Sequence, residues 1–209
     1  MKPVRLSACP LVRSYYLNPD VVFLARDLLG KKLCTRINGI QTYGIITETE
    51  AYAGITDKAS HAFGDRRTAR TEIMYAQGGT AYVYLCYGMH SLFNVVTNVK
   101  GVPHAILVRA IEPVEGIETM LLRRGKSRTG TGFTDGPGKV ASALGIHYSH
   151  SGMDLTVIPP GKEKSAIWIE HTGMQMDEQE ILAGPRIGVQ YAGEDAAKPY
   201  RFLIRKVGA

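Results

Sequence analysis

The sequence predicts an α+β domain with a mostly antiparallel β-sheet and few helices. The chain has 209 residues, enough for one domain or a tight pair, and its 44% hydrophobic content is that of a folded globular protein. Short runs rich in β-branched and aromatic residues follow one another in hairpin-like succession. Helical periodicity is confined to three stretches, so alternating βαβ units are not expected.

The first predicted helix lies at residues 18–30. Asn18 is the expected cap, Pro19 suits the first turn, and Asp20 complements the helix dipole. Apolar residues between 22 and 29 form one face, and Gly30 ends the helix. Two further helices are predicted at 114–124 and 139–144.

A β-hairpin is the next predicted element. Residues 32–37 and 40–52 are its strands, and Asn38-Gly39 between them is a strong turn signal because both residues tolerate positive φ. Further strands are predicted at 81–86, 92–99, 104–110, 155–158, 167–170, 187–190 and 200–205. The segment 123–139 is rich in glycine and basic residues, which indicates a surface loop, either a solvated connector or one that contacts phosphates.

Charge and cysteine content limit the classes of function. Lys and Arg number 25 against 19 Asp and Glu, and this net charge of +6 favours a polyanionic partner without proving one. Cys9, Cys34 and Cys86 form no CxxC pair, so neither a disulfide framework nor a cysteine zinc site is expected. No apolar run approaches the roughly 20 residues of a membrane helix, and residues 1–6 lack the apolar block of a signal peptide. We therefore expect a cytoplasmic protein that contacts no membrane.

Two glutamates lie on the predicted strand 40–52. Glu48 and Glu50 are two residues apart, so their side chains point to the same face. A carboxylate at the end of such a strand is costly to bury unless it is paired or has a function. The alternative is an edge strand with both glutamates in solvent, which the usual exposure of glutamate favours.

Tyrosines cluster near the middle of the chain. Tyr82 and Tyr84 alternate with apolar residues and share one strand face, as in platforms that stack nucleic-acid bases. Tyr87 lies at a predicted turn, where an exposed ring could act as a wedge. Ordinary sheet-edge tyrosines are the alternative. Taken alone, His61 and the basic stretch 65–70 are equally compatible with solvated loops.

Together, these motifs resemble the alkyladenine (3-methyladenine) DNA glycosylase family, monomeric enzymes that excise alkylated and deaminated purines. The match runs in the family's order from about residue 18 to residue 206 and is similar to bacterial members, which lack the N-terminal extension of vertebrate ones. The matching stretches are ARDLLG at 25–30, TETEAY at 47–52, ASH at 59–61, GTAYVYLCYGM at 79–89, FNV at 93–95, LVRAIEP at 107–113, GPGK at 136–139, RIGV at 186–189 and YAG at 191–193.

The resemblance implies a fold and a catalytic centre. It implies one DNA glycosylase domain over residues 1–209, with its core at about 18–206, built on a curved sheet with flanking helices and a protruding β-hairpin. Glu50 resembles the general base that activates the attacking water, and Arg109 the residue that holds that water with it. Tyr52, His61 and Tyr84 resemble the walls that stack on the flipped base, and His61 also hydrogen-bonds to it.

The resemblance also implies how DNA is held. Asn94 resembles a gate that clashes with the exocyclic amino group of guanine, and Tyr87 resembles the wedge that fills the space left by the base. Arg66, Thr68 and Lys139 are candidates for contacts to the DNA backbone. The implied partner is double-stranded DNA, entered through the minor groove by a monomer. Neither a metal nor an organic cofactor is implied.

Two other functions stay open at this stage. One is a catalytically inactive nucleic-acid binder that keeps the tyrosine platform, although Glu50, His61 and Arg109 as a set argue against it. The other is a nucleoside hydrolase, although a free nucleoside would give the Tyr87 wedge no base stack to hold open. No lysine adjoins the Glu50–Tyr52 motif, so a Schiff-base lyase activity is not expected.

Overall fold

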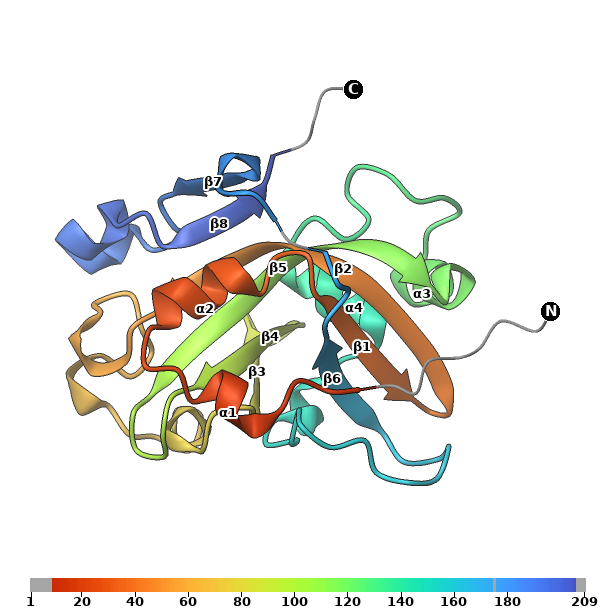
Figure 1. The fold of residues 1–209 in the computed structure, drawn as a ribbon, viewed down its shortest axis with the longest axis horizontal. Helices are drawn as coiled ribbons and strands as arrows, with labels where there is room; N and C mark the ends of the chain where they lie inside the picture. The colour runs from red at the N-terminus through yellow and green to blue at the C-terminus, as the bar shows by residue number, and fades with distance from the viewer. Residues whose placement is uncertain (1–8, 175, 206–209) are drawn as a thin grey trace.

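One antiparallel sheet organises the part of the chain that the structure, a computed structural model, describes: residues 9–174 and 176–205 (Figure 1). Residues 1–6, where we expect no signal peptide, and residue 206, the expected end of the core, lie outside these ranges. The strands are β1 (Lys32–Ile37), β2 (Ile40–Tyr52), β3 (Ala81–Cys86), β4 (His90–Thr97), β5 (His104–Glu115), β6 (Ala166–Glu170), β7 (Ile181–Gly184) and β8 (Arg201–Ile204).

The sheet curls around its longest strands, β2 and β5. The strand order is β3-β4-β5-β2-β1-β6, with β8 added to β2 and β7 added to β8. On the side away from β5, β2 pairs first with β1, over residues 40–45, and then with β8, over residues 48–50. Bulges interrupt the β2–β5 ladder between residues 43 and 49, and such bulges bend a strand and increase its twist. The predicted curved antiparallel sheet and α+β class are confirmed.

Short helices cover one face of this sheet. The α-helices are α1 (Arg13–Tyr16), α2 (Val21–Asp27), α3 (Ile117–Arg124) and α4 (Pro137–Leu144). The 3-10 helices are η1 (Gly54–Thr56), η2 (Phe63–Asp65), η3 (Glu72–Tyr75), η4 (Tyr148–His150), η5 (Glu178–Glu180) and η6 (Gln190–Ala197). Helix α2 packs on β2, β5 and β8, α4 packs on β4 and β5, and α3 packs on α4. Within the described ranges, no helix is long and apolar enough to cross a membrane.

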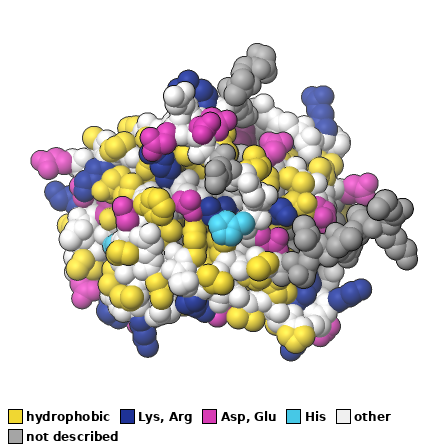
Figure 2. Space-filling view, in the orientation of Figure 1, with side chains coloured by type: hydrophobic (Ala, Val, Ile, Leu, Met, Phe, Trp, Pro, Cys, Tyr) yellow, Lys and Arg dark blue, Asp and Glu magenta, His cyan; other side chains and the backbone are white. Residues whose placement is uncertain are grey.

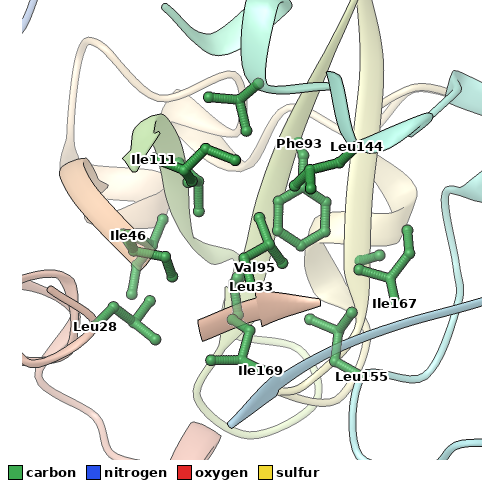
Figure 3. Packing of buried hydrophobic residues seen from close by; sticks show 14 of the residues in the cluster. Leu28, Leu33, Ile46, Phe93, Val95, Ile111, Leu144, Leu155, Ile167 and Ile169 are labelled. Carbon is green, nitrogen blue, oxygen red and sulfur yellow. The ribbon is translucent and has the colours of Figure 1, made fainter. Parts of the chain in front are cut away.

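The main core lies between the sheet and these helices. Figure 3 shows the side chain of Leu28, which directly follows α2, meeting side chains from α4 and five different strands there. The labelled members are Leu28, Leu33, Ile46, Phe93, Val95, Ile111, Leu144, Leu155, Ile167 and Ile169, all buried. Core members alternate along three strands: Ala81 and Val83 of β3, Phe93 and Val95 of β4, and Ile106 and Val108 of β5. Since side chains alternate along a strand, the residues between these core members face the other side of the sheet.

The predicted hairpin and turn chemistry are confirmed. Strands β1 and β2 have the predicted bounds, and Asn38 and Gly39 both adopt positive φ, 53° and 76°, between them. Strands β3 and β4 form a second hairpin, whose turn contains Tyr87 at φ 51° and Gly88 at φ 70°.

Several predicted boundaries are wrong. The N-cap of α2 is Asp20, whose Oδ1 accepts hydrogen bonds from the amides of Val22 and Phe23, whereas Asn18 instead accepts one from the amide of Asp20. Pro19 therefore precedes the cap, and the helix ends at Asp27 rather than at residue 30.

The helix predicted from residue 114 begins at Ile117. Strand β5 continues to Glu115 because Pro113 and Glu115 still pair with β2, at Gly44 and Tyr43. Gly116, at φ 74°, turns the chain before the helix.

Two predicted strands, 155–158 and 187–190, are not strands, and β7 was not predicted. At the first, Oδ1 of Asp154 accepts from both the amide and the hydroxyl of Thr156, so a local turn replaces the ladder. At the second, the amide of Ile187 donates to the Glu50 carboxylate instead of to a strand.

Candidate active site

A row of side chains crosses four strands on the sheet face opposite the main core. Tyr82 on β3 lies opposite Asn94 on β4, Asn94 lies opposite Leu107 on β5, and Leu107 lies opposite Glu50 on β2. The first three line a cavity of about 370 Å³, within the usual range for small-molecule pockets. Sheet register thus gathers residues that are up to 57 positions apart in sequence, from Glu50 to Leu107.

Glu50 lies directly behind the cavity wall. Its side chain is 0% exposed, so the alternative of a solvent-exposed glutamate is wrong for this residue. Its Oε2 accepts hydrogen bonds from the Tyr52 hydroxyl at 2.8 Å and from Nη1 of Arg109 at 3.3 Å, and its Oε1 accepts one from the amide of Ile187 at 2.7 Å. All three donors line the cavity. The carboxylate is therefore held in one orientation beside the cavity.

Arg109 connects the two glutamates of β2. Its Nε donates to Oε1 of Glu48 at 3.0 Å while its Nη1 reaches Glu50, and its side chain is 12% exposed. Arg201 on β8 donates to the same Glu48 oxygen at 2.6 Å. Glu48 and Glu50 share one strand face as predicted, and Glu48 acts as the anchor that keeps Arg109 beside Glu50.

Aromatic side chains form the cavity walls. Tyr52, Tyr82 and Tyr84 line it together with His61, whose ring meets that of Tyr84 edge to face at a centroid distance of 4.7 Å. Burial raises the pKa of Tyr52 well above its usual value, as does the Glu50 carboxylate beside it, so Tyr52 stays a protonated donor. Strand β3 is at the edge of the sheet, and both Tyr82 and Tyr84 on it face this cavity.

His61 is neutral in this environment. Burial lowers its pKa to about 4, and the guanidinium groups of Arg70 and Arg66 contribute to the shift. Its Nδ1 lies 2.9 Å from the hydroxyl of Tyr82. In a neutral imidazole one ring nitrogen is a hydrogen-bond donor and the other is an acceptor. The contact of Nδ1 with Tyr82 therefore determines whether Nε2 donates or accepts.

Asn94 is buried at the floor of the cavity. Its Nδ2 donates to the backbone carbonyl groups of Tyr82 at 3.2 Å and of Leu92 at 3.3 Å. The amide is therefore fixed by β3 and β4 rather than free to rotate, which is what a rigid steric gate requires.

Tyr87 and the predicted backbone contacts lie outside the buried cluster. Tyr87 lines the cavity at the tip of the β3–β4 hairpin and is 90% exposed. Arg66 and Thr68 lie on an exposed loop between η2 and η3. Lys139, in the first turn of α4, forms an ion pair with Asp135 at 2.8 Å. A phosphate contact by Lys139 would have to compete with this carboxylate.

The sequence matches the family at residues 186–189, after β7, but indicated no role for them in the site. Ile187 supplies a backbone donor to Glu50, and Ile187, Gly188 and Val189 line the cavity. Arg186 beside them is fully buried in an ion pair with Asp57. The available signal was an arginine set between a proline and an apolar residue, since a charge in such a place must be paired when it is buried.

The arrangement combines a fixed carboxylate, an arginine and an aromatic cavity. Among the described residues, no group of three or more His, Cys, Asp and Glu side chains could hold a metal ion. Chemically, the carboxylate can accept a proton or stabilise a developing cation, and the aromatic walls can stack on a flat ring.

Comparisons with known proteins agree with this geometry. The sequence model of the methylpurine-DNA glycosylase family matches residues 15–207. A protein of Chlamydia felis named "Putative 3-methyladenine DNA glycosylase" is 45% identical over 195 residues, which cover 93% of this chain and 95% of that protein. Proteins of the same name from Bacillus cereus (strain AH820) and Clostridium acetobutylicum are 43% identical over 195 residues and 42% identical over 202 residues, covering 88% and 93% of this chain and 90% and 94% of their own lengths.

The predicted resemblance is thereby confirmed, and with it a place among the DNA repair enzymes that hydrolyse N-glycosyl bonds. A family match over nearly the whole chain and relatives above 40% identity lead to one conclusion: the chain belongs to the methylpurine-DNA glycosylase family.

Proposed function

We propose that this DNA glycosylase turns alkylated or deaminated purines out of duplex DNA and hydrolyses their N-glycosidic bond with a water activated by Glu50. The observation that carries the proposal is the buried Glu50 carboxylate, fixed by three donors behind an aromatic cavity. A nucleic-acid binder without activity would gain nothing from holding a desolvated carboxylate in one orientation, because such burial is costly.

In the proposed reaction the damaged base enters the cavity and stacks between its aromatic walls. Tyr52 and Tyr84 supply flat faces, and neutral His61 offers a hydrogen bond at the base edge. Leaving the duplex stack costs a few kcal/mol, least for damaged or mispaired bases. Asn94, rigid at the cavity floor, excludes the exocyclic amino group of guanine and so spares the undamaged base.

Hydrolysis then needs a water between Glu50 and the sugar. Glu50 takes a proton from this water while the bond to the base breaks through a cation-like sugar, which the carboxylate also stabilises. Arg109 lies on the cavity side of Glu50 and orients the water. Catalytic hydrogen bonds often reach their final geometry only in the substrate complex. We therefore place the water between Arg109, Tyr52 and Ile187 when the base is bound.

The reaction is monofunctional. A glycosylase with lyase activity forms a Schiff base through an amine. None of the described residues that line the cavity is a lysine. The enzyme therefore releases the base and leaves an abasic site, with no covalent intermediate that borohydride could trap.

The DNA is a duplex whose minor groove receives the β3–β4 hairpin. Tyr87 at the exposed tip acts as the wedge that replaces the base, and Arg66, Thr68 and Lys139 contact the backbone on either side. The enzyme acts as a monomer in the bacterial cytoplasm.

The test is a strand-cleavage assay on end-labelled duplex with one hypoxanthine or ethenoadenine. Purified protein in excess should yield a break at the lesion only after alkali, and none in a matched undamaged duplex. Cleavage without alkali, or a product trapped by borohydride, would contradict the monofunctional reaction. Retention of the duplex without any alkali-labile site would favour the inactive binder, and hydrolysis of free nucleosides would favour the nucleoside hydrolase.

A further inference from the structure

We infer that Arg186 is a positioning residue for base excision, because it holds two of the three groups that hydrogen-bond the Glu50 carboxylate. The inference rests on the proposed role of Glu50 as the general base. It concerns a side chain that belongs neither to the aromatic walls nor to the cavity lining.

The guanidinium group of Arg186 joins three segments of the chain. Its Nη1 donates to the carbonyl of Ala51 at 2.8 Å and to Oδ2 of Asp57. Its Nη2 donates to Oδ1 of Asp57 at 2.8 Å and to the carbonyl of Asp195 at 3.1 Å. The side chains of Arg186 and Asp57 are both 0% exposed. This fork ties the end of β2 to the loop that follows it and to the segment 186–195.

Two of the donors to Glu50 depend on this fork. Ile187, whose amide donates to Oε1 of Glu50 at 2.7 Å, is the next residue in the chain. Tyr52, whose hydroxyl donates to Oε2 at 2.8 Å, has its ring 4.9 Å from the Arg186 guanidinium carbon. In the described structure no hydrogen bond joins Arg186 to Glu50 itself, so Arg186 acts by fixing Ile187 and Tyr52.

The contact set requires the planar fork of arginine. Four acceptors surround its two terminal nitrogens, and its Nε has no hydrogen-bond partner among the described residues. A lysine ammonium is a point charge on a flexible stem and cannot span the same acceptors. Arg186→Lys therefore removes the fork but keeps a positive charge beside the buried Asp57. Losing that positive charge would leave the Asp57 carboxylate unpaired and would destabilise the fold much more.

The experiment compares Arg186→Lys with Arg13→Lys. Arg13 also joins a carboxylate, that of Asp154, to a backbone carbonyl, that of Gly78, but it hydrogen-bonds none of the three donors to Glu50. Single-turnover excision is measured on an ethenoadenine duplex and expressed per active site. Active sites are counted by titration with a duplex that carries a tetrahydrofuran abasic-site analogue. The rate per active site is therefore independent of how much of the protein is folded. We expect Arg186→Lys to lower the rate by about 100-fold, as for a misplaced reacting group, and Arg13→Lys to match the parent.

The Glu50→Gln background separates positioning from a general structural role. Residues that act as a unit have non-additive effects, so Arg186→Lys should leave the residual rate of Glu50→Gln unchanged. Asp57→Asn, which keeps the shape of the partner but removes its charge, should behave in the same way.

Two results would overturn the inference: a rate per active site equal to the parent's, or an equal loss of rate in the parent and Glu50→Gln backgrounds. If Arg186→Lys yields no active sites, the same criteria apply to Asp57→Asn. A parent protein that excises no base, or a Glu50→Gln variant as fast as the parent, would instead contradict the proposed function and is recognised before any Arg186 variant is compared.

Discussion

The protonation of His61, a residue of the cavity wall, is linked to folding. Burial, with smaller contributions from Arg70 and Arg66, lowers its pKa to about 4 in the folded chain, against about 6.5 in an unfolded one. Between these two values the unfolded chain binds a proton that the folded chain does not. Stability therefore falls as the pH is lowered through this window.

His61→Gln should remove this dependence. Going from pH 7 to pH 4.5, the parent should lose on the order of 2–3 kcal/mol more free energy of unfolding than the variant. Urea titrations at several pH values measure both curves. Burial also lowers the pKa of His104 and His150, but these residues are present in both proteins and cancel in the difference. Parallel curves would show that His61 is not held neutral by the fold.

At Glu50 the sequence identified the residue but not its environment. Alternation placed Glu48 and Glu50 on one face, and the family motif suggested a role for Glu50. Burial could not be predicted, because two of the three donors to the carboxylate come from β5 and from the segment after β7, far away in sequence. A pattern within one strand contains no information about such partners.

At the scale of elements, the β3–β4 hairpin presents Tyr87 at its tip. Tyr87 is 90% exposed, so packing against the described residues does not explain an aromatic side chain at this position. An exposed ring at the rim of the cavity is suited to replace the stacking that a displaced base gives up.

Tyr87→Ala should lower the fraction of displaced base. Loss of a stacked aromatic side chain is worth about 1–3 kcal/mol, or roughly 5- to 150-fold in the equilibrium. Fluorescence of an ethenoadenine in the duplex measures it. Tyr87→Phe is the matched control and should resemble the parent, because the wedge needs a ring and not its hydroxyl. Equal displacement by the alanine variant, or equal damage from the phenylalanine variant, would exclude a wedge.

Strand β2 needs a glycine at position 44, where it pairs closely with β5. A Cβ at Gly44 would lie 2.7 Å from the carbonyl oxygen of Glu112 and 2.8 Å from Cδ1 of Ile111. At Gly184 in β7 a Cβ would meet nothing within 4 Å. Gly44→Ala should therefore destabilise the fold by about 1–3 kcal/mol, whereas Gly184→Ala should stay within about 0.5 kcal/mol. Thermal unfolding of both variants measures this, and equal melting temperatures would disprove the close contact.

The elements that the sequence predicted well are those fixed by local chemistry. Asn38-Gly39 sets the first hairpin, and alternation sets β3. The errors have different causes: Asp154 diverts one β-branched run into a local turn, and the Glu50 carboxylate, far away in sequence, captures the amide of Ile187 in another. Strand β7 was missed because Ala183 and Gly184 make half of it weak in strand propensity, and β8 alone holds it in place.

At the scale of the whole molecule, the net charge is +6. Figure 2 shows acidic and basic side chains interspersed on one face, with no broad area of a single sign. Beside the cavity, Arg66 forms no ion pair with a described residue, and Arg70 lines the cavity itself. These two positions are placed to meet phosphates beside a displaced base.

Arg66→Ala should reduce the slope of log K against log salt for duplex binding by about one unit, equally for damaged and undamaged DNA. Lys139→Ala should change it less, because Asp135 already neutralises that ammonium. Lys162, on an exposed loop beside the β1–β2 turn, is the control and should leave the slope unchanged when replaced by alanine. Fluorescence anisotropy across a salt series measures all three. An unchanged slope for Arg66→Ala would remove it from the DNA contacts.

Excision by Glu50→Gln under single-turnover conditions tests the account most directly. The substitution keeps the shape and burial of the side chain but removes the base, and Glu112→Gln on the exposed part of β5 is the matched control. We predict that Glu50→Gln binds a hypoxanthine duplex as the parent does but excises the base at least about 10²–10⁴-fold more slowly, the usual contribution of a general base. Glu112→Gln should match the parent in both measurements. Excision by Glu50→Gln at a rate near that of the parent would contradict the role of this carboxylate.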